Sequence, residues 1–126
     1  MGERRKYVRL PVSLEIECSL EGEENEVKKA QVKDITIGGV RIILDKQYQP
    51  GANLLLKIFL LPELEPIILK GRIVWQTKVQ KNDTVYFETG VEFTDIEISD
   101  KLRIRRFMFD IVREILKELD KMSMEI

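Results

Sequence analysis

The periodicity of apolar residues constrains the fold of this chain most strongly, because it changes once along the sequence. Up to about residue 98, apolar and polar residues alternate with a period of two, which is typical of half-buried β-strands. From residue 99 onward, apolar residues recur at steps of three and four, which is typical of an amphipathic helix. We therefore expect a mostly β fold that ends in one α-helix.

Turn-forming residues divide the alternating region into six segments. The expected turns lie at residues 21–25, 38–39, 49–51, 62–66 and 81–83. The strands that they separate lie at residues 12–18, 27–37, 40–44, 54–61, 67–79 and 85–93. Six short strands at this spacing predict a small antiparallel β-barrel.

The C-terminal helix is predicted at residues 99–122, with Ser99 or Asp100 as its N-cap. The helix has more apolar surface than is needed to cover one end of a small barrel, because a second row of apolar residues lies beside its main apolar stripe. The stripe contains Met108, Ile111, Ile115 and Leu119, and the second row contains Phe109, Val112 and Leu116. Two interpretations stay open: the helix plugs the barrel and leaves a few apolar residues exposed, or it pairs with a second copy in a homodimer.

Composition narrows the functional classes. The 126 residues suit one domain, and they include no histidine and a single cysteine, so the usual zinc ligands and the commonest general base are missing. With 21 basic and 22 acidic residues, the net charge of −1 gives no global attraction for nucleic acid. Neither a secretory signal nor an apolar run of membrane-spanning length is present. We therefore expect a cytoplasmic, non-enzymatic protein without a cofactor, metal or membrane insertion.

The first candidate motif is a basic segment near the N-terminus that contains Arg4, Arg5 and Arg9. Arg5 and Arg9 are four residues apart, so their side chains lie on one side of either a helical turn or an extended strand. A guanidinium group matches phosphate oxygens and also the O6 and N7 acceptors of guanine. The segment is therefore a candidate arm for binding a nucleotide, and a solvated basic tail is the alternative.

The second candidate motif follows the second predicted strand and contains Asp34, Thr36, Gly38 and Gly39. With a period of two, Asp34 and Thr36 share one face of the strand, while Ile35 and Ile37 share the other. A carboxylate and a hydroxyl can bind the polar edge of a base, and glycine lets the backbone approach a ligand. A polar turn that closes a strand at a glycine bulge is the structural alternative.

Taken together and in this order, the motifs resemble those of the PilZ family, in which R-x-x-x-R precedes D/N-x-S-x-x-G. Residues 71–75 (GRIVW) and 90–93 (GVEF) are similar to two later strands of that family, and the terminal helix is similar as well. The resemblance covers nearly the whole chain. It implies one PilZ-like domain at 1–126, with a ligand-binding arm at 1–11, a six-stranded antiparallel barrel at 12–98 and the helix at 99–122.

The resemblance further implies a receptor for cyclic di-GMP that regulates a protein partner, so far unknown, of a motility, pilus or exopolysaccharide system. Arg5 and Arg9, assisted by Arg4, would bind the phosphates and a guanine edge. The other base would lie against Asp34, Thr36, Gly38 and Gly39. Thr36 stands where the family usually has serine, which keeps the hydroxyl but adds a methyl group to a stiffer side chain.

Two other functions are compatible with such a barrel. A PilZ-like adaptor could act through protein contacts alone, without nucleotide, but both arginines of the first motif are retained. A barrel that binds single-stranded nucleic acid would need a basic groove with exposed aromatic residues. The slightly acidic chain speaks against that class, and Trp75 is expected in the core, as strand aromatics usually are.

Overall fold

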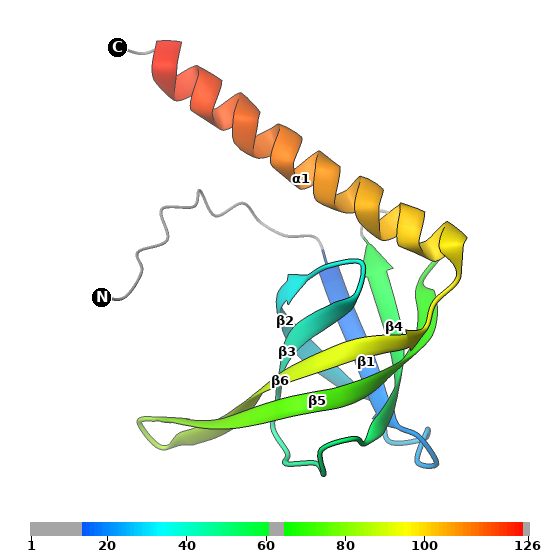
Figure 1. Ribbon diagram of the computed structural model, residues 1–126. Coiled ribbons are helices and arrows are strands. Elements are labelled where there is room, and N and C mark those ends of the chain that lie inside the picture. Colours follow the sequence, from blue (N-terminus) through cyan, green and yellow to red (C-terminus); the bar gives the residue numbers. More distant parts are fainter. Residues whose placement is uncertain (1–13, 61–64, 125–126) are drawn as a thin grey trace.

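The computed structural model describes residues 14–60 and 65–124. Its six strands form a closed antiparallel barrel in the order β1-β2-β3-β6-β5-β4, followed by one helix (Figure 1), which confirms the predicted fold class. The elements are β1 (Leu14–Leu20), β2 (Lys28–Ile35), β3 (Gly39–Leu44), β4 (Asn53–Leu60), β5 (Ile67–Lys81), β6 (Thr84–Asp95) and α1 (Ile98–Met124).

The barrel closes around apolar side chains that alternate with outward-facing residues along much of β1, β3, β4 and the first half of β5. In β4 the alternation is complete, and Leu54, Leu56, Ile58 and Leu60 are all buried. Together with Ile42 of β3 and their neighbours, they form one hydrophobic core. Burial of this apolar surface is the main driving force for folding, and the strand pattern alone directs it to one face.

Strands β5 and β6 are the longest, and their hairpin extends beyond the rest of the barrel (Figure 1). The β5–β6 register shifts between Ile73 and Trp75, so Ile73 is buried while Val74 and Trp75 are both exposed. Trp75 therefore lies on the outer surface with 40% of its area exposed, and the prediction that it belongs to the core is wrong. The cause is the bulge, because one extra residue reverses the side on which the next side chain points.

The helix α1 begins at Ile98, one residue before the earliest predicted N-cap, and extends to Met124. The carbonyl oxygen of Glu97 accepts hydrogen bonds from the amides of Asp100 and Lys101, each at 3.0 Å. Glu97 is thus the N-cap, and the assignment of Ser99 or Asp100 to that position is wrong. Asp100 instead lies in the first turn, where its negative charge interacts favourably with the helix dipole.

Only the first part of α1 contacts the barrel. Ile104 is fully buried in the core, and Phe107 and Met108 pack against it in part. Beyond these residues the helix projects away from the barrel (Figure 1). The helix therefore covers one end of the barrel with a few residues and leaves most of its apolar surface uncovered by the described part of its own chain.

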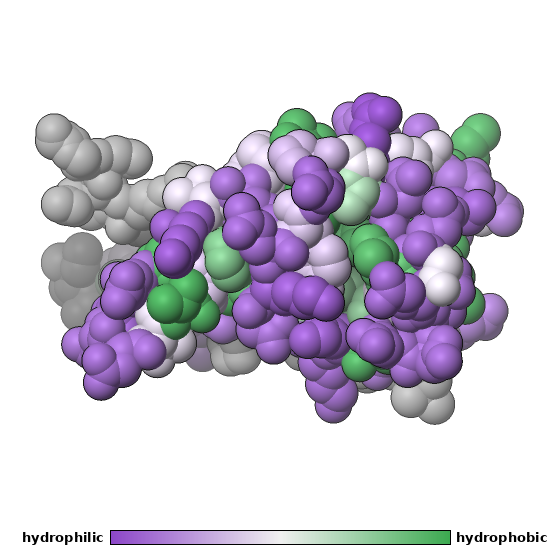
Figure 2. Space-filling model, turned by 90° about the horizontal axis from the view of Figure 1, so that it is seen from below, coloured by the Kyte–Doolittle hydropathy of each residue, from purple (hydrophilic) through white to green (hydrophobic). Residues whose placement is uncertain are grey.

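The end of the barrel that lies away from α1 is predominantly hydrophilic, and hydrophobic side chains appear on it only as separate spots (Figure 2). This pattern is usual for a solvent-facing surface, where single apolar residues are common. Within the described ranges, no helix has both the length and the hydropathy needed to cross a membrane.

Candidate functional site

The second motif forms the tight turn between β2 and β3. Strand β2 ends at Ile35, so Thr36 lies in the turn and does not continue one face of the strand with Asp34, as we had expected. The Thr36 amide donates to the carbonyl oxygen of Gly39 at 2.9 Å, and the Thr36 hydroxyl oxygen accepts from the Gly38 amide at 3.1 Å. Ile35 packs against the core, whereas Ile37 is exposed at the tip of the turn. The turn is therefore ordered by its own polar groups.

Asp34 is held by an ion pair that was not predicted from the sequence. Arg41 of β3 is its cross-strand partner, and the Arg41 Nη2 atom donates to Asp34 Oδ2 at 2.6 Å. The two residues are seven apart and lie on either side of the Gly38–Gly39 turn. A hairpin at this turn brings them together on neighbouring strands, so their pairing could have been predicted from the sequence. The Asp34 side chain remains 54% exposed and can accept further hydrogen bonds, because a carboxylate has about four acceptor positions.

The two glycines of the motif have different surroundings. A Cβ atom on Gly39 would overlap with the carbonyl oxygen of Val91 in β6, so this position requires glycine for close strand packing. A Cβ atom on Gly38 would have only one neighbour, the Thr36 hydroxyl oxygen at 3.9 Å. Gly38 is exposed, and its carbonyl oxygen accepts from the Phe93 amide at 2.9 Å. Of the two glycines, Gly38 is therefore the one with open space beside it.

The outer surface next to the turn is built from a row of residues across four strands. Asp34 of β2 pairs with Arg41 of β3, Arg41 pairs with Gly90 of β6, and Gly90 pairs with Trp75 of β5. A side chain on Gly90 would overlap with the Trp75 indole, which lies across this glycine. At strand spacings of about 4.8 Å, the row spans roughly 14 Å, which is the scale of a nucleotide.

Strands β5 and β6, which contain residues 71–75 and 90–93, pair with each other beside this row. Arg72 of β5 faces Glu92 of β6, and their side chains form an ion pair. Glu92 is in turn the partner of Gly39. Both carboxylates near the turn, Asp34 and Glu92, are thus neutralised by arginines. Among residues 14–60 and 65–124, no group of His, Cys, Asp or Glu side chains is suited to hold a metal ion.

The predicted arm, with Arg4, Arg5 and Arg9, lies outside the described residues. Strand β1 begins at Leu14, and its antiparallel pairing with β2 brings this start to the same end of the barrel as the β2–β3 turn (Figure 1). Toward this end, β1 and β2 separate and leave an open hollow of about 500 Å³. The hollow is lined by Leu14, Glu15, Ile16, Lys29, Ala30, Gln31 and Val32.

A closed six-stranded antiparallel barrel with an exposed polar turn between β2 and β3, covered at one end by a helix, defines the class of small β-barrel domains to which this chain belongs. Residues 3–110 match the family model described as PilZ domain. The chain therefore belongs to the PilZ domain family, which confirms the resemblance inferred from the motifs. None of the curated proteins matches the chain.

Several solved structures share the fold. MrkH of K. pneumonia in its apo state is 16% identical, with a TM-score of 0.70, and the match covers 94% of this chain and 56% of MrkH. The MrkH complex with c-di-GMP is 18% identical, with a TM-score of 0.66 and coverage of 93% and 56%. The inhibitor of motility MotI/DgrA of Bacillus subtilis is 22% identical, with a TM-score of 0.63 and coverage of 92% and 54%. The chain thus spans about half the length of each of these proteins.

Proposed function

We propose that this protein is a non-enzymatic receptor for cyclic di-GMP. The observation that carries the proposal is the arrangement of Asp34, at the end of β2, beside Thr36 and Gly38 of the exposed turn that follows, at the barrel end where β1 begins. Family membership supports it, as does a shared fold with MrkH, which has been solved in complex with c-di-GMP.

The chemistry of the turn suits a guanine base. The Asp34 carboxylate can accept hydrogen bonds from the N1 and N2 donors of guanine, and the side on which Arg41 does not donate is the natural place for them. Gly38 offers no side chain that would keep a flat base away from the backbone. Adenine presents a different donor pattern on that edge, so the carboxylate also provides specificity.

The arm supplies the positive charge that the described turn lacks. Arg9 precedes the start of β1 at Leu14 by five residues, a length of chain that spans at most about 17 Å. We infer that Arg9, together with Arg4 and Arg5, donates to the phosphates and to a guanine edge of a nucleotide bound at the turn. We infer that closing the arm over the ligand creates a new surface, which a protein of a motility, pilus or exopolysaccharide system recognises.

Calorimetric titration tests the receptor function directly. We expect cyclic di-GMP to bind with a Kd in the micromolar range or tighter, while GMP and cyclic di-AMP bind far more weakly. An adaptor that works without nucleotide would give no heat with any of the three. A barrel for single-stranded nucleic acid would instead bind an oligonucleotide and ignore the cyclic dinucleotide. Either result would remove the proposed function.

Replacing Asp34 with alanine is expected to weaken cyclic di-GMP binding by about 1–3 kcal/mol, because donors on the base lose their acceptor. The stability of the free protein should change by less than about 1 kcal/mol, since the lost ion pair with Arg41 is partly exposed. Asp45→Ala is the matched control, because it removes another exposed ion pair, with Lys28, at the far end of β3. Equal affinities for wild type and Asp34→Ala would place the base elsewhere.

A further inference from the structure

The part of α1 that projects from the barrel carries a continuous apolar stripe, made of the second apolar row of the helix together with Leu119. Phe109, Val112, Leu116 and Leu119 recur at steps of three and four, and between 46% and 57% of the surface of each is exposed. These steps place them at alternating core positions of a heptad pattern, which is the pattern by which helices pair. The stripe begins at Phe109, directly after Met108, the last residue of α1 that packs against the core.

The charges along α1 are distributed unequally between its two halves. Residues 98–113 contain five basic and two acidic side chains, a net charge of +3. Residues 114–124 contain two basic and three acidic side chains, a net charge of −1. The basic half also lies at the positive end of the helix dipole. One half of the helix therefore attracts the other half of a second copy.

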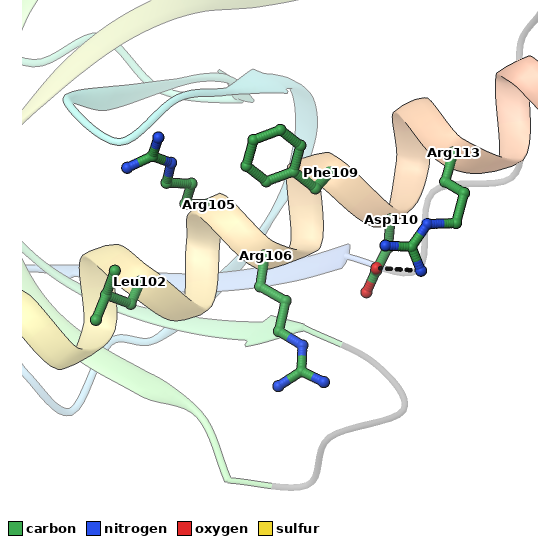
Figure 3. A pocket seen from close by; sticks show the side chains of 6 residues that line it. All are labelled: Leu102, Arg105, Arg106, Phe109, Asp110 and Arg113. Atoms are coloured by element: carbon green, nitrogen blue, oxygen red, sulfur yellow. Dashed lines mark ion pairs between the residues drawn. The ribbon is translucent and has the colours of Figure 1, made fainter.

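The basic half contains a shallow hollow of about 320 Å³ at the start of the stripe (Figure 3). Its apolar parts are Leu102 and Phe109, and the Arg105 guanidinium lies 5.8 Å from the centre of the Phe109 ring. Arg106 and Arg113 border the hollow, and Arg113 forms an ion pair with Asp110 at 3.7 Å. The hollow is thus an apolar depression with a cationic rim.

We propose that two copies of this chain pair through α1 in an antiparallel arrangement. In this arrangement Phe109 packs on Leu119 of the second copy, and Val112 packs on Leu116. Arg106 then lies opposite Asp120 of the second copy, at flanking positions of the helix pair, and this contact occurs twice by symmetry. Leu119 of the second copy contacts Phe109 at the edge of the hollow.

The charges favour this orientation over a parallel pair. Parallel helices would place the two basic halves side by side and align the helix dipoles, and both arrangements are unfavourable. They would also move Arg106 away from Asp120 and bring two barrels to the same end. The paired segment 106–120 is about 20 Å long, so the interface is at the small end of specific ones, and the dimer should be reversible.

Disulfide trapping tests the orientation. Cys18 does not interfere, because it is buried and burial raises the pKa of its thiol to about 11. In the antiparallel pair, residue 109 lies close to residue 119 of the second copy and far from its own equivalent. We expect mild oxidation to cross-link a mixture of Phe109→Cys and Leu119→Cys proteins, but neither protein alone. Cross-linking of each variant with itself, and not in the mixture, would overturn the antiparallel arrangement.

Sedimentation equilibrium with charge-swapped variants tests the pairing itself. Arg106→Asp and Asp120→Arg should each weaken the dimer about tenfold, and the double variant should restore it. Val112→Glu with Leu116→Glu should give a monomer. Ile68→Glu is the matched control, because Ile68 is an equally exposed apolar residue on β5 and should leave the dimer intact. A wild-type protein that sediments near 14.8 kDa at tens of micromolar would reject the proposal, whether or not it binds nucleotide.

Discussion

Substituting alanine for Arg9 is expected to reduce the affinity for cyclic di-GMP at least about a hundredfold, while the melting temperature of the free protein stays unchanged. A guanidinium that donates two or more charge-assisted hydrogen bonds contributes roughly 1.5–3 kcal/mol for each of them. Stability is expected to stay the same, because among the described residues the core already contains side chains from all six strands and Ile104 of α1. The same result is expected for Arg5→Ala.

Lys6→Ala provides the control for this experiment, because it removes one positive charge from the same segment without removing a planar fork of donors. We expect it to weaken binding only a few-fold, by an amount that shrinks as salt is added. The measurements are calorimetric titration and thermal melting of each variant. If Arg9→Ala clearly lowered the melting temperature of the free protein, the loss of affinity would follow from lost stability. Arg9 would then be a structural residue, and the arm would not be a ligand-binding element.

Gly39→Ala is expected to destabilise the protein by about 2–3 kcal/mol, because the new methyl group overlaps with the backbone carbonyl of Val91. Backbone atoms in a paired strand cannot move aside alone, so β3 must separate from β6 where Gly39 pairs with Glu92. For a domain of this size, the melting temperature should fall by roughly 8–15 °C. Any loss of ligand affinity would then follow from the displaced turn.

Gly38→Ala separates this structural role from a role in binding. Its methyl group has open space, with the nearest atom at 3.9 Å, so stability should be unchanged. Affinity for cyclic di-GMP should fall, because the methyl group occupies the surface on which the base is proposed to lie. Thermal melting and titration of both variants distinguish the two positions. A Gly39→Ala protein that melts like the wild type would show that the spacing of β3 and β6 does not depend on this glycine.

The sequence by itself determined the six strands, the terminal helix and the family. These features depend on local patterns: alternation along β4 selects one buried face, and the change of period near residue 99 indicates a helix. Asp34, Thr36, Gly38 and Gly39 were proposed as site residues in the same way, because an ordered set of short motifs can be recognised without knowledge of contacts.

Only the tertiary structure decided how these residues are used. Arg41 was identified as the partner of Asp34 by the register of β2 on β3, and Gly39 owes its role to the backbone of β6. A bulge in the pairing of β5 with β6 placed Trp75 on the outer surface. Each of these outcomes depends on which strands are neighbours and in which register they pair. That information belongs to contacts between distant parts of the chain, which no local periodicity contains.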